Sequence, residues 1–133
     1  MNGVELASAV RTRLEGSLPR EIYVHAVPAG PLPLRYVLVR TSEGSEAATR
    51  AVGTVSTQTP ALWVYSTSMH PDPERAAEEA AWGAGKAREA LRNWRVEGRW
   101  AVTHEASDAA RRDESLPDAT FVAVEQFSLR SSV

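Results

Sequence analysis

Three histidines, His25, His70 and His104, are the side chains of this sequence best suited to acid–base chemistry or to metal binding. None of them has a second histidine or a carboxylate at the spacing that metal ligands usually keep along a chain. His104 and Glu105 are adjacent, but adjacent residues of a strand point to opposite faces of a sheet. We therefore interpret the histidines as structural residues, and the alternative is a metal site assembled from distant segments.

A charged segment at residues 107–117, together with the residue that follows it, holds a cluster of carboxylates: Asp108, Asp113, Glu114 and Asp118. The cluster lacks the regularly spaced oxygen ligands and the turn glycine of a calcium-binding loop. Arg111 and Arg112 balance the acids, so a solvated loop is the simpler interpretation.

Other patterns with a known chemistry are missing from the sequence. It has no glycine motif of a P-loop or of a dinucleotide fold, and no serine lies in a nucleophile elbow. The chain has no cysteine, which excludes disulfides, thiol catalysis and cysteine-bound zinc. We therefore expect no catalytic residue, no cofactor and no metal site.

Trp82 is a large aromatic residue on the polar side of a predicted helix. Its helical neighbours are Arg75, Glu78, Glu79, Lys86 and Glu89. Tryptophan is enriched at interface hot spots, so Trp82 is a candidate contact for another protein. The alternative is that Trp82 packs on Lys86 or under a neighbouring loop, with a cation–π contact. Gly83 costs the helix about 1 kcal/mol relative to alanine, which favours the close approach of another group there.

Trp63 and Tyr65 share one face of a predicted strand, and Leu62 and Val64 share the other. Both faces of this strand are therefore apolar, and one of them should lie under a helix. The other face either meets a second layer or forms an exposed patch for a partner.

The spacing of apolar residues predicts the elements that position these side chains. We expect helices over residues 2–15 and from Asp72 to about Arg95, with Asp72 as the N-cap and Pro73 at the first helical position. The predicted buried side of the second helix consists of Ala77, Ala80, Ala84, Ala87, Leu91 and Trp94. The predicted strands cover residues 21–27, 34–41, 50–57, 61–68, 100–106 and 118–129, with the charged loop 107–117 between the last two.

This order predicts a single α+β domain over residues 1–133, a mainly antiparallel sheet packed by an N-terminal helix and one long central helix. A hydrophobic share of 43% is that of an ordinary globular protein. The net charge of -2 argues against a dedicated nucleic-acid binder, which carries a basic excess. We see no secretory signal and no apolar run long enough to span a membrane, so we expect a soluble protein made in a cytoplasm.

The layout of the chain resembles that of the tail terminator, or tail completion, proteins of long-tailed phages, especially phages that infect actinobacteria. The features that carry the resemblance are the short N-terminal helix, the proline-rich connector at residues 28–33, and the Asp72-Pro73 cap of a helix ending near Leu91-Arg92-Asn93-Trp94. A final strand pair follows, with a charged loop that ends in Pro117-Asp118. The resemblance covers nearly the whole chain and rests on layout and size, with no catalytic motif to compare.

The resemblance implies an assembly role without catalysis. Such proteins form a ring, usually a homo-hexamer, on the end of the tail tube, where they stop polymerisation of the major tail tube protein. The ring gives the head connector or head-completion protein a surface to dock on, and DNA passes through its lumen without specific binding. The protein would then be part of the virion tail or neck, assembled in the cytoplasm of the host bacterium without contact to a membrane.

A ring needs two different surfaces on each subunit, because one face must fit another face of the next copy. Trp82 and the pair Trp63 and Tyr65 are our candidates for these two subunit interfaces. The loop at residues 42–49 and the charged loop 107–117 are candidate docking loops, through Glu43, Glu46, Arg111, Arg112, Asp113 and Glu114.

Two alternatives remain open. The first is another neck component, such as a head-completion or head–tail joining protein, which shares the ring but binds a different neighbour. The second is a small α+β ligand-binding domain or enzyme, in which His25, His104 or Tyr36 would line an apolar cavity with a convergent polar group.

Overall fold

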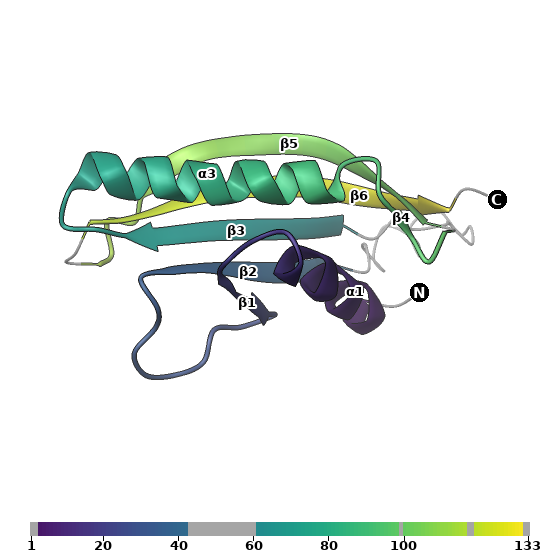
Figure 1. The fold of residues 1–133 in the computed structure, drawn as a ribbon, viewed down its shortest axis with the longest axis horizontal. Coiled ribbons are helices and arrows are strands. Elements are labelled where there is room, and N and C mark those ends of the chain that lie inside the picture. Colours follow the sequence, from purple (N-terminus) through teal and green to yellow (C-terminus); the bar gives the residue numbers. More distant parts are fainter. Residues whose placement is uncertain (1–2, 43–60, 99, 117–118, 132–133) are drawn as a thin grey trace, which may run out of the picture.

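The computed structural model of the chain describes residues 3–42, 61–98, 100–116 and 119–131, and Figure 1 shows the arrangement of its elements. The helices and strands follow in the order α1 (Gly3–Glu15), β1 (Glu21–Val24), β2 (Arg35–Ser42), β3 (Ala61–Met69), α3 (Pro73–Leu91), β4 (Arg95–Val96), β5 (Trp100–Arg112) and β6 (Thr120–Ser131). None of the helices in these ranges is long and apolar enough to cross a membrane. The predicted strand 50–57, the candidates Glu43 and Glu46, and the Pro117-Asp118 pair lie outside the described residues.

The six strands form one sheet in the order β1-β2-β3-β6-β5-β4. Every neighbouring pair is antiparallel except β1 and β2, which are parallel. Parallel neighbours need a crossover connection, which the proline-rich segment between β1 and β2 supplies without a helix. Both helices lie on the same side of the sheet in Figure 1. The predicted α+β fold with a mainly antiparallel sheet is therefore confirmed.

The core lies between the helices and one face of the sheet. The buried residues of α1 are Gly3, Leu6, Ala7, Val10 and Leu14, and those of α3 are Ala76, Ala80, Gly83, Ala84, Ala87 and Leu91. Across from them lie the alternate residues of the central strands, among them Val37, Leu62, Val64, Phe127 and Leu129. We call the opposite side of the sheet the far face. It carries Tyr36, Trp63, Tyr65, Val124 and Gln126, all half-buried.

The central helix begins as predicted and ends earlier than predicted. The Asp72 side chain accepts a hydrogen bond from the backbone N–H of Glu74 at 3.0 Å, and Pro73 occupies the first turn. The helix ends at Leu91 and not near Arg95, because Arg92 is extended and Asn93 has a left-handed φ of 63°. The chain then forms the short strand β4, which the sequence did not predict. On the buried side of α3, the buried alanine is Ala76 and not the predicted Ala77. Trp94 lies beyond the end of the helix and packs against the core.

Two strand ends also differ from the prediction. Strand β1 ends at Val24 and not at Val27, because His25 has a φ of 69°. Strand β5 continues to Arg112, so most of the predicted charged loop 107–117 is a strand paired with β6. Two register shifts in this pair, between His104 and Ala106 and between Asp108 and Arg111, interrupt the alternation on which the prediction depended.

Candidate functional site

The candidate interface residues lie on opposite sides of the sheet. Trp82 is on α3, with 46% of its surface exposed. Trp63 and Tyr65 are half-buried on the far face of β3, while Leu62 and Val64 are buried beneath the helices. The strand therefore has two apolar faces, as predicted, and only one of them is covered by α1 and α3.

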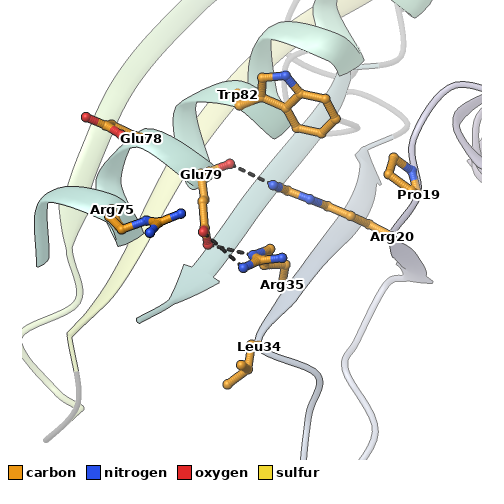
Figure 2. A pocket seen from close by; sticks show the side chains of 8 residues that line it. All are labelled: Pro19, Arg20, Leu34, Arg35, Arg75, Glu78, Glu79 and Trp82. Carbon is orange, nitrogen blue, oxygen red and sulfur yellow. Dashed lines mark hydrogen bonds and ion pairs between the residues drawn. The ribbon is translucent and has the colours of Figure 1, made fainter. Parts of the chain in front are cut away.

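Trp82 borders an open groove of about 810 Å³ between α3 and the residues that lead into β1 and β2. Figure 2 shows its lining: Pro19, Arg20, Leu34, Arg35, Arg75, Glu78, Glu79 and Trp82. The exposed apolar side chains of Leu34 and Trp82 are combined there with three guanidinium groups. Such a combination suits a polar or acidic protein surface that also carries apolar side chains.

Arg20 extends from the segment before β1 to α3. Its Nη1 donates to Ser66 Oγ at 3.2 Å, and its Nη2 donates to the backbone carbonyl of Glu79 at 2.9 Å. Its guanidinium lies 5.1 Å from the centre of the Trp82 ring, and Lys86 Nζ lies 5.8 Å from the same ring. The cation–π interpretation of Trp82 is therefore confirmed, although nearly half of the ring stays exposed.

Gly83 makes room for this arginine. A Cβ at this position would overlap both Arg20 Nη1 and Ser66 Oγ, far inside van der Waals contact. The close approach that Gly83 predicted does occur, and the approaching group is Arg20. Glycine is thus required here for space, at the cost in helix propensity that the sequence indicated.

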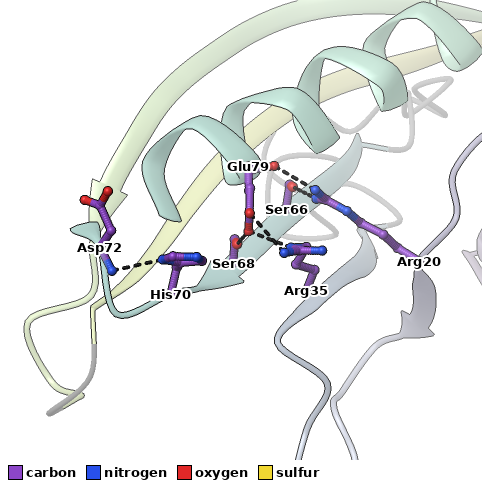
Figure 3. Close-up of polar contacts among 7 residues, drawn as sticks. All are labelled: Arg20, Arg35, Ser66, Ser68, His70, Asp72 and Glu79. Carbon is purple, nitrogen blue, oxygen red and sulfur yellow. Dashed lines mark hydrogen bonds and ion pairs between the residues drawn. The ribbon is translucent and has the colours of Figure 1, made fainter. Parts of the chain in front are cut away.

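Glu79 is the acidic centre of the groove, as Figure 3 shows. Arg35 binds its carboxylate with two hydrogen bonds, from Nε at 2.6 Å and from Nη2 at 3.0 Å, and Ser68 Oγ donates a third at 2.7 Å. The Arg35 hydrogen bonds lower the pKa of Glu79, an effect that burial opposes. The Glu79 carboxylate is therefore held in its ionised form by partners within the same chain.

The groove keeps an excess of positive charge. Burial lowers the pKa of Arg20, and the neighbouring charge of Arg35 lowers it further, while Glu79 acts in the opposite direction. Among the described residues, neither Arg20 nor Arg75 forms an ion pair with a carboxylate. Glu78 also lines the groove, but its side chain points away from the guanidinium groups in Figure 2. An incoming carboxylate would relieve this excess.

A second polar cluster lies between α3 and β6. Glu125 is 1% exposed, and it accepts a hydrogen bond from Arg88 Nη1 at 2.9 Å. Its other oxygen lies 3.4 Å from His104 Nε2, and Ser107 Oγ lies 3.0 Å from that same nitrogen. A catalytic triad needs the nucleophile and the acid on different imidazole nitrogens. Because Ser107 and Glu125 meet one nitrogen, this imidazole does not connect them as a triad would.

The remaining candidates for ligand chemistry are dispersed. His104 lies on the helix-covered face, whereas Tyr36 lies on the far face with its ring 5.8 Å from that of Tyr23. His70 Nδ1 accepts from the backbone N–H of Asp72 at 2.9 Å. Within the described ranges, no group of three or more histidine, aspartate or glutamate side chains could hold a metal ion. The sheet therefore separates residues that a shared ligand pocket would require together.

The predicted docking loop is divided between a strand and a turn. Arg111 pairs with Val122 and Arg112 pairs with Phe121, so the two arginines belong to β5 and point to opposite faces. Asp113 and Glu114 belong to the turn that follows, in which the Asp113 carboxylate accepts from the backbone N–H of Ser115 at 3.0 Å. The four residues therefore do not form one charged loop.

The far face has a smaller hollow of about 190 Å³ between β3, β6 and β5. Its lining is Trp63, Tyr65, Ala106, Asp108, Val124 and Gln126. Asp108 is exposed, and it is the one charged residue among the described residues of this lining. The sequence missed both this hollow and the groove, because each is assembled from segments that are distant along the chain.

Some signals for these sites were present in the sequence. Glu125 alternates with Ala123, Phe127 and Leu129, so a charged residue occupied the predicted buried side of a strand. Ser66 and Ser68 continue the buried side of β3 in the same manner. Buried polar groups need partners, and these positions could have been identified as parts of a polar cluster.

The chain was compared with known proteins. A scan against protein-family models matches no family, and a search of curated proteins finds no similar sequence.

Proposed function

We propose that this protein is a structural virion protein that caps the tail tube of a long-tailed phage as a ring. In this role it ends tube polymerisation and provides the surface on which the head connector docks. The observation that carries the proposal is the pair of different aromatic surfaces on opposite sides of one sheet, Trp82 on α3 and Trp63 with Tyr65 on β3.

A closed ring is built from a heterologous contact, in which one surface of a subunit meets a different surface of the next. The two aromatic surfaces differ in both shape and charge. One is a groove lined by three arginines and two glutamates, and the other is a hollow whose described lining has one charged residue, Asp108. Aromatic side chains surrounded by polar groups are typical of the centres of protein interfaces.

The ion pairs between α3 and the sheet also support a structural role. Glu79 is bonded by Arg35 and Ser68, and Glu125 is bonded by Arg88. Each carboxylate is therefore held by partners of the same chain and is positioned to join the helix layer to the sheet.

The proposal is tested by negative-stain microscopy of phage particles assembled with and without this protein. We expect tails of uncontrolled length in its absence, because nothing would stop the addition of tube subunits. Tails of normal length that remain detached from heads would assign the protein to the head–tail joining role instead. Normal, attached tails would contradict both assignments.

A further inference from the structure

The groove and the hollow each contain an exposed charged side chain that forms no ion pair among the described residues, and the two charges have opposite signs. In the groove, Arg75 is exposed and forms no ion pair among the described residues, beside the partly desolvated Arg20. In the hollow, Asp108 is exposed and likewise forms no ion pair there. Each site thus combines an exposed charge with a tryptophan in its lining.

Both sites also offer apolar surface. The groove offers Leu34, which is 59% exposed, and Trp82 as apolar surface beside its guanidinium groups. The hollow surrounds Asp108 with Trp63, Tyr65 and Val124. A contact between them would bury aromatic surface at the centre and join a carboxylate to an arginine, which favours both affinity and a fixed orientation.

We infer that the two sites bind each other in successive copies of this chain, with the Asp108 carboxylate of one copy bound by Arg75 in the groove of the next. Trp82 packs against the aromatic hollow in this contact. The inference rests on the proposed function, because it supplies the repeated contact from which the ring is built.

The positions of the sites favour a repeated contact over a symmetric dimer. The groove lies on the helix side near β1 and β2, and the hollow lies on the far face between β3, β6 and β5. One copy can therefore bind a neighbour at each site simultaneously. A two-fold dimer through the grooves would instead bring together the arginines of both copies, and like charges that face each other are unfavourable.

The first test is charge reversal, with the oligomer mass measured by analytical ultracentrifugation. We expect Arg75→Glu and Asp108→Arg each to lower self-association at least tenfold. Mixing the two variants should restore it, because each mutant site then meets a complementary site on the other variant. The matched controls Arg95→Glu and Glu97→Arg make the same charge changes at exposed positions outside both sites and should assemble like the wild type.

Circular dichroism of each variant separates a lost contact from a lost fold. If folded Arg75→Glu and Asp108→Arg chains keep the wild-type oligomer mass, the inferred contact is wrong. It is also wrong if both variants dissociate but their mixture does not reassociate, because complementary charges would then not be meeting.

The second test uses the lack of cysteine in the chain. A chain with both Glu78→Cys and Ala106→Cys, which line the groove and the hollow and leave Arg75 and Asp108 in place, is treated with a short bis-maleimide, in solution and in purified tails. We expect a ladder of linked copies, which neither single variant can form because each link needs one site of each kind. Because purified tails are also tested, this measurement detects the contact even when the wild-type chain is monomeric before it reaches the tail.

The outcomes distinguish the two proposals. Correctly capped tails without a ladder would overturn the inferred contact and leave the proposed function intact. A ladder in solution together with normal tails in the absence of the protein would support the contact and overturn the function.

Discussion

Two polar clusters join α3 to the sheet. The helix supplies the acidic partner in one cluster and the basic partner in the other. In the groove, the helix supplies the carboxylate of Glu79 and the sheet supplies the guanidinium of Arg35. Farther along the helix, the sheet supplies Glu125 and the helix supplies Arg88. Both clusters fix the helix on the sheet, but only the first leaves charges and an aromatic ring available to a partner.

The difference lies in burial and in the balance of charge. Glu125 is enclosed, and its two oxygens face Arg88 and His104. The groove is lined by three arginines, by the bonded carboxylate of Glu79 and by the exposed Glu78, and Trp82 remains 46% exposed. The enclosed cluster should therefore contribute chiefly to stability, whereas the open groove should contribute less to stability and more to recognition.

The largest expected effect is at the enclosed cluster. Glu125→Ala removes one partner of a buried ion pair and leaves a cavity, which should lower the free energy of unfolding by about 3 kcal/mol. The partly exposed Arg88 can turn to water after the substitution, which keeps the loss from being larger. Urea unfolding measures the change, with the exposed Glu114→Ala expected within about 0.5 kcal/mol of the wild type. Equal losses in the two variants would mean that Glu125 contributes no more to the free energy of unfolding than the exposed Glu114 does.

A smaller effect on the free energy of unfolding is expected at Gly83 inside α3. Its control should change this free energy in the opposite direction. Gly83→Ala gains about 1 kcal/mol in helix propensity, but its methyl group displaces Arg20 and crowds Ser66, which costs about 1–3 kcal/mol. We expect a net loss of about 1 kcal/mol in the free energy of unfolding, which thermal unfolding measures. Gly85→Ala is the matched control, because its Cβ would meet only Arg88 Nη2 at 3.9 Å. It should gain up to about 1 kcal/mol, and a similar gain for Gly83→Ala would contradict the tight packing of Arg20.

Local patterns in the sequence predicted much of the fold. The Asp72 cap, the alanine side of α3 and the two faces of β3 follow from residue spacing alone. Strand alternation carries no information on direction, so the parallel pairing of β1 with β2 was not predictable. The register shifts in β5 moved residues to the opposite face and made a paired strand resemble a polar loop.

The candidate sites were predictable only in fragments. Trp82 and Gly83 each indicated a close neighbour, but nothing near them in the sequence identified Arg20 as that neighbour. The prediction placed Trp63 and Tyr65 together, but Asp108 enters their hollow only because β5 continues past Ala106 and shifts its register. Contacts between distant segments depend on topology, which residue spacing does not specify.

The smallest effect concerns the carboxylate of the open groove. Because folding lowers the pKa of Glu79, its ionised form stabilises the fold above the ordinary carboxyl value of 4.5, and this contribution is lost as the pH falls below that value. Glu79→Gln should therefore lower the free energy of unfolding by about 0.5 kcal/mol at neutral pH, a modest value because Arg35 is half-exposed.

The difference between Glu79→Gln and the wild type should shrink as urea unfolding is repeated at decreasing pH, toward about pH 3. Other acids with lowered pKa, such as Asp113, titrate in both proteins and cancel from this difference. Glu78→Gln, one residue away and exposed, is the matched control, and its free energy of unfolding at neutral pH should stay within about 0.5 kcal/mol of the wild type. If the loss in Glu79→Gln stayed constant down to pH 3, neutral hydrogen bonds would account for it. The charge of Glu79 would then contribute nothing measurable to the stability of the fold.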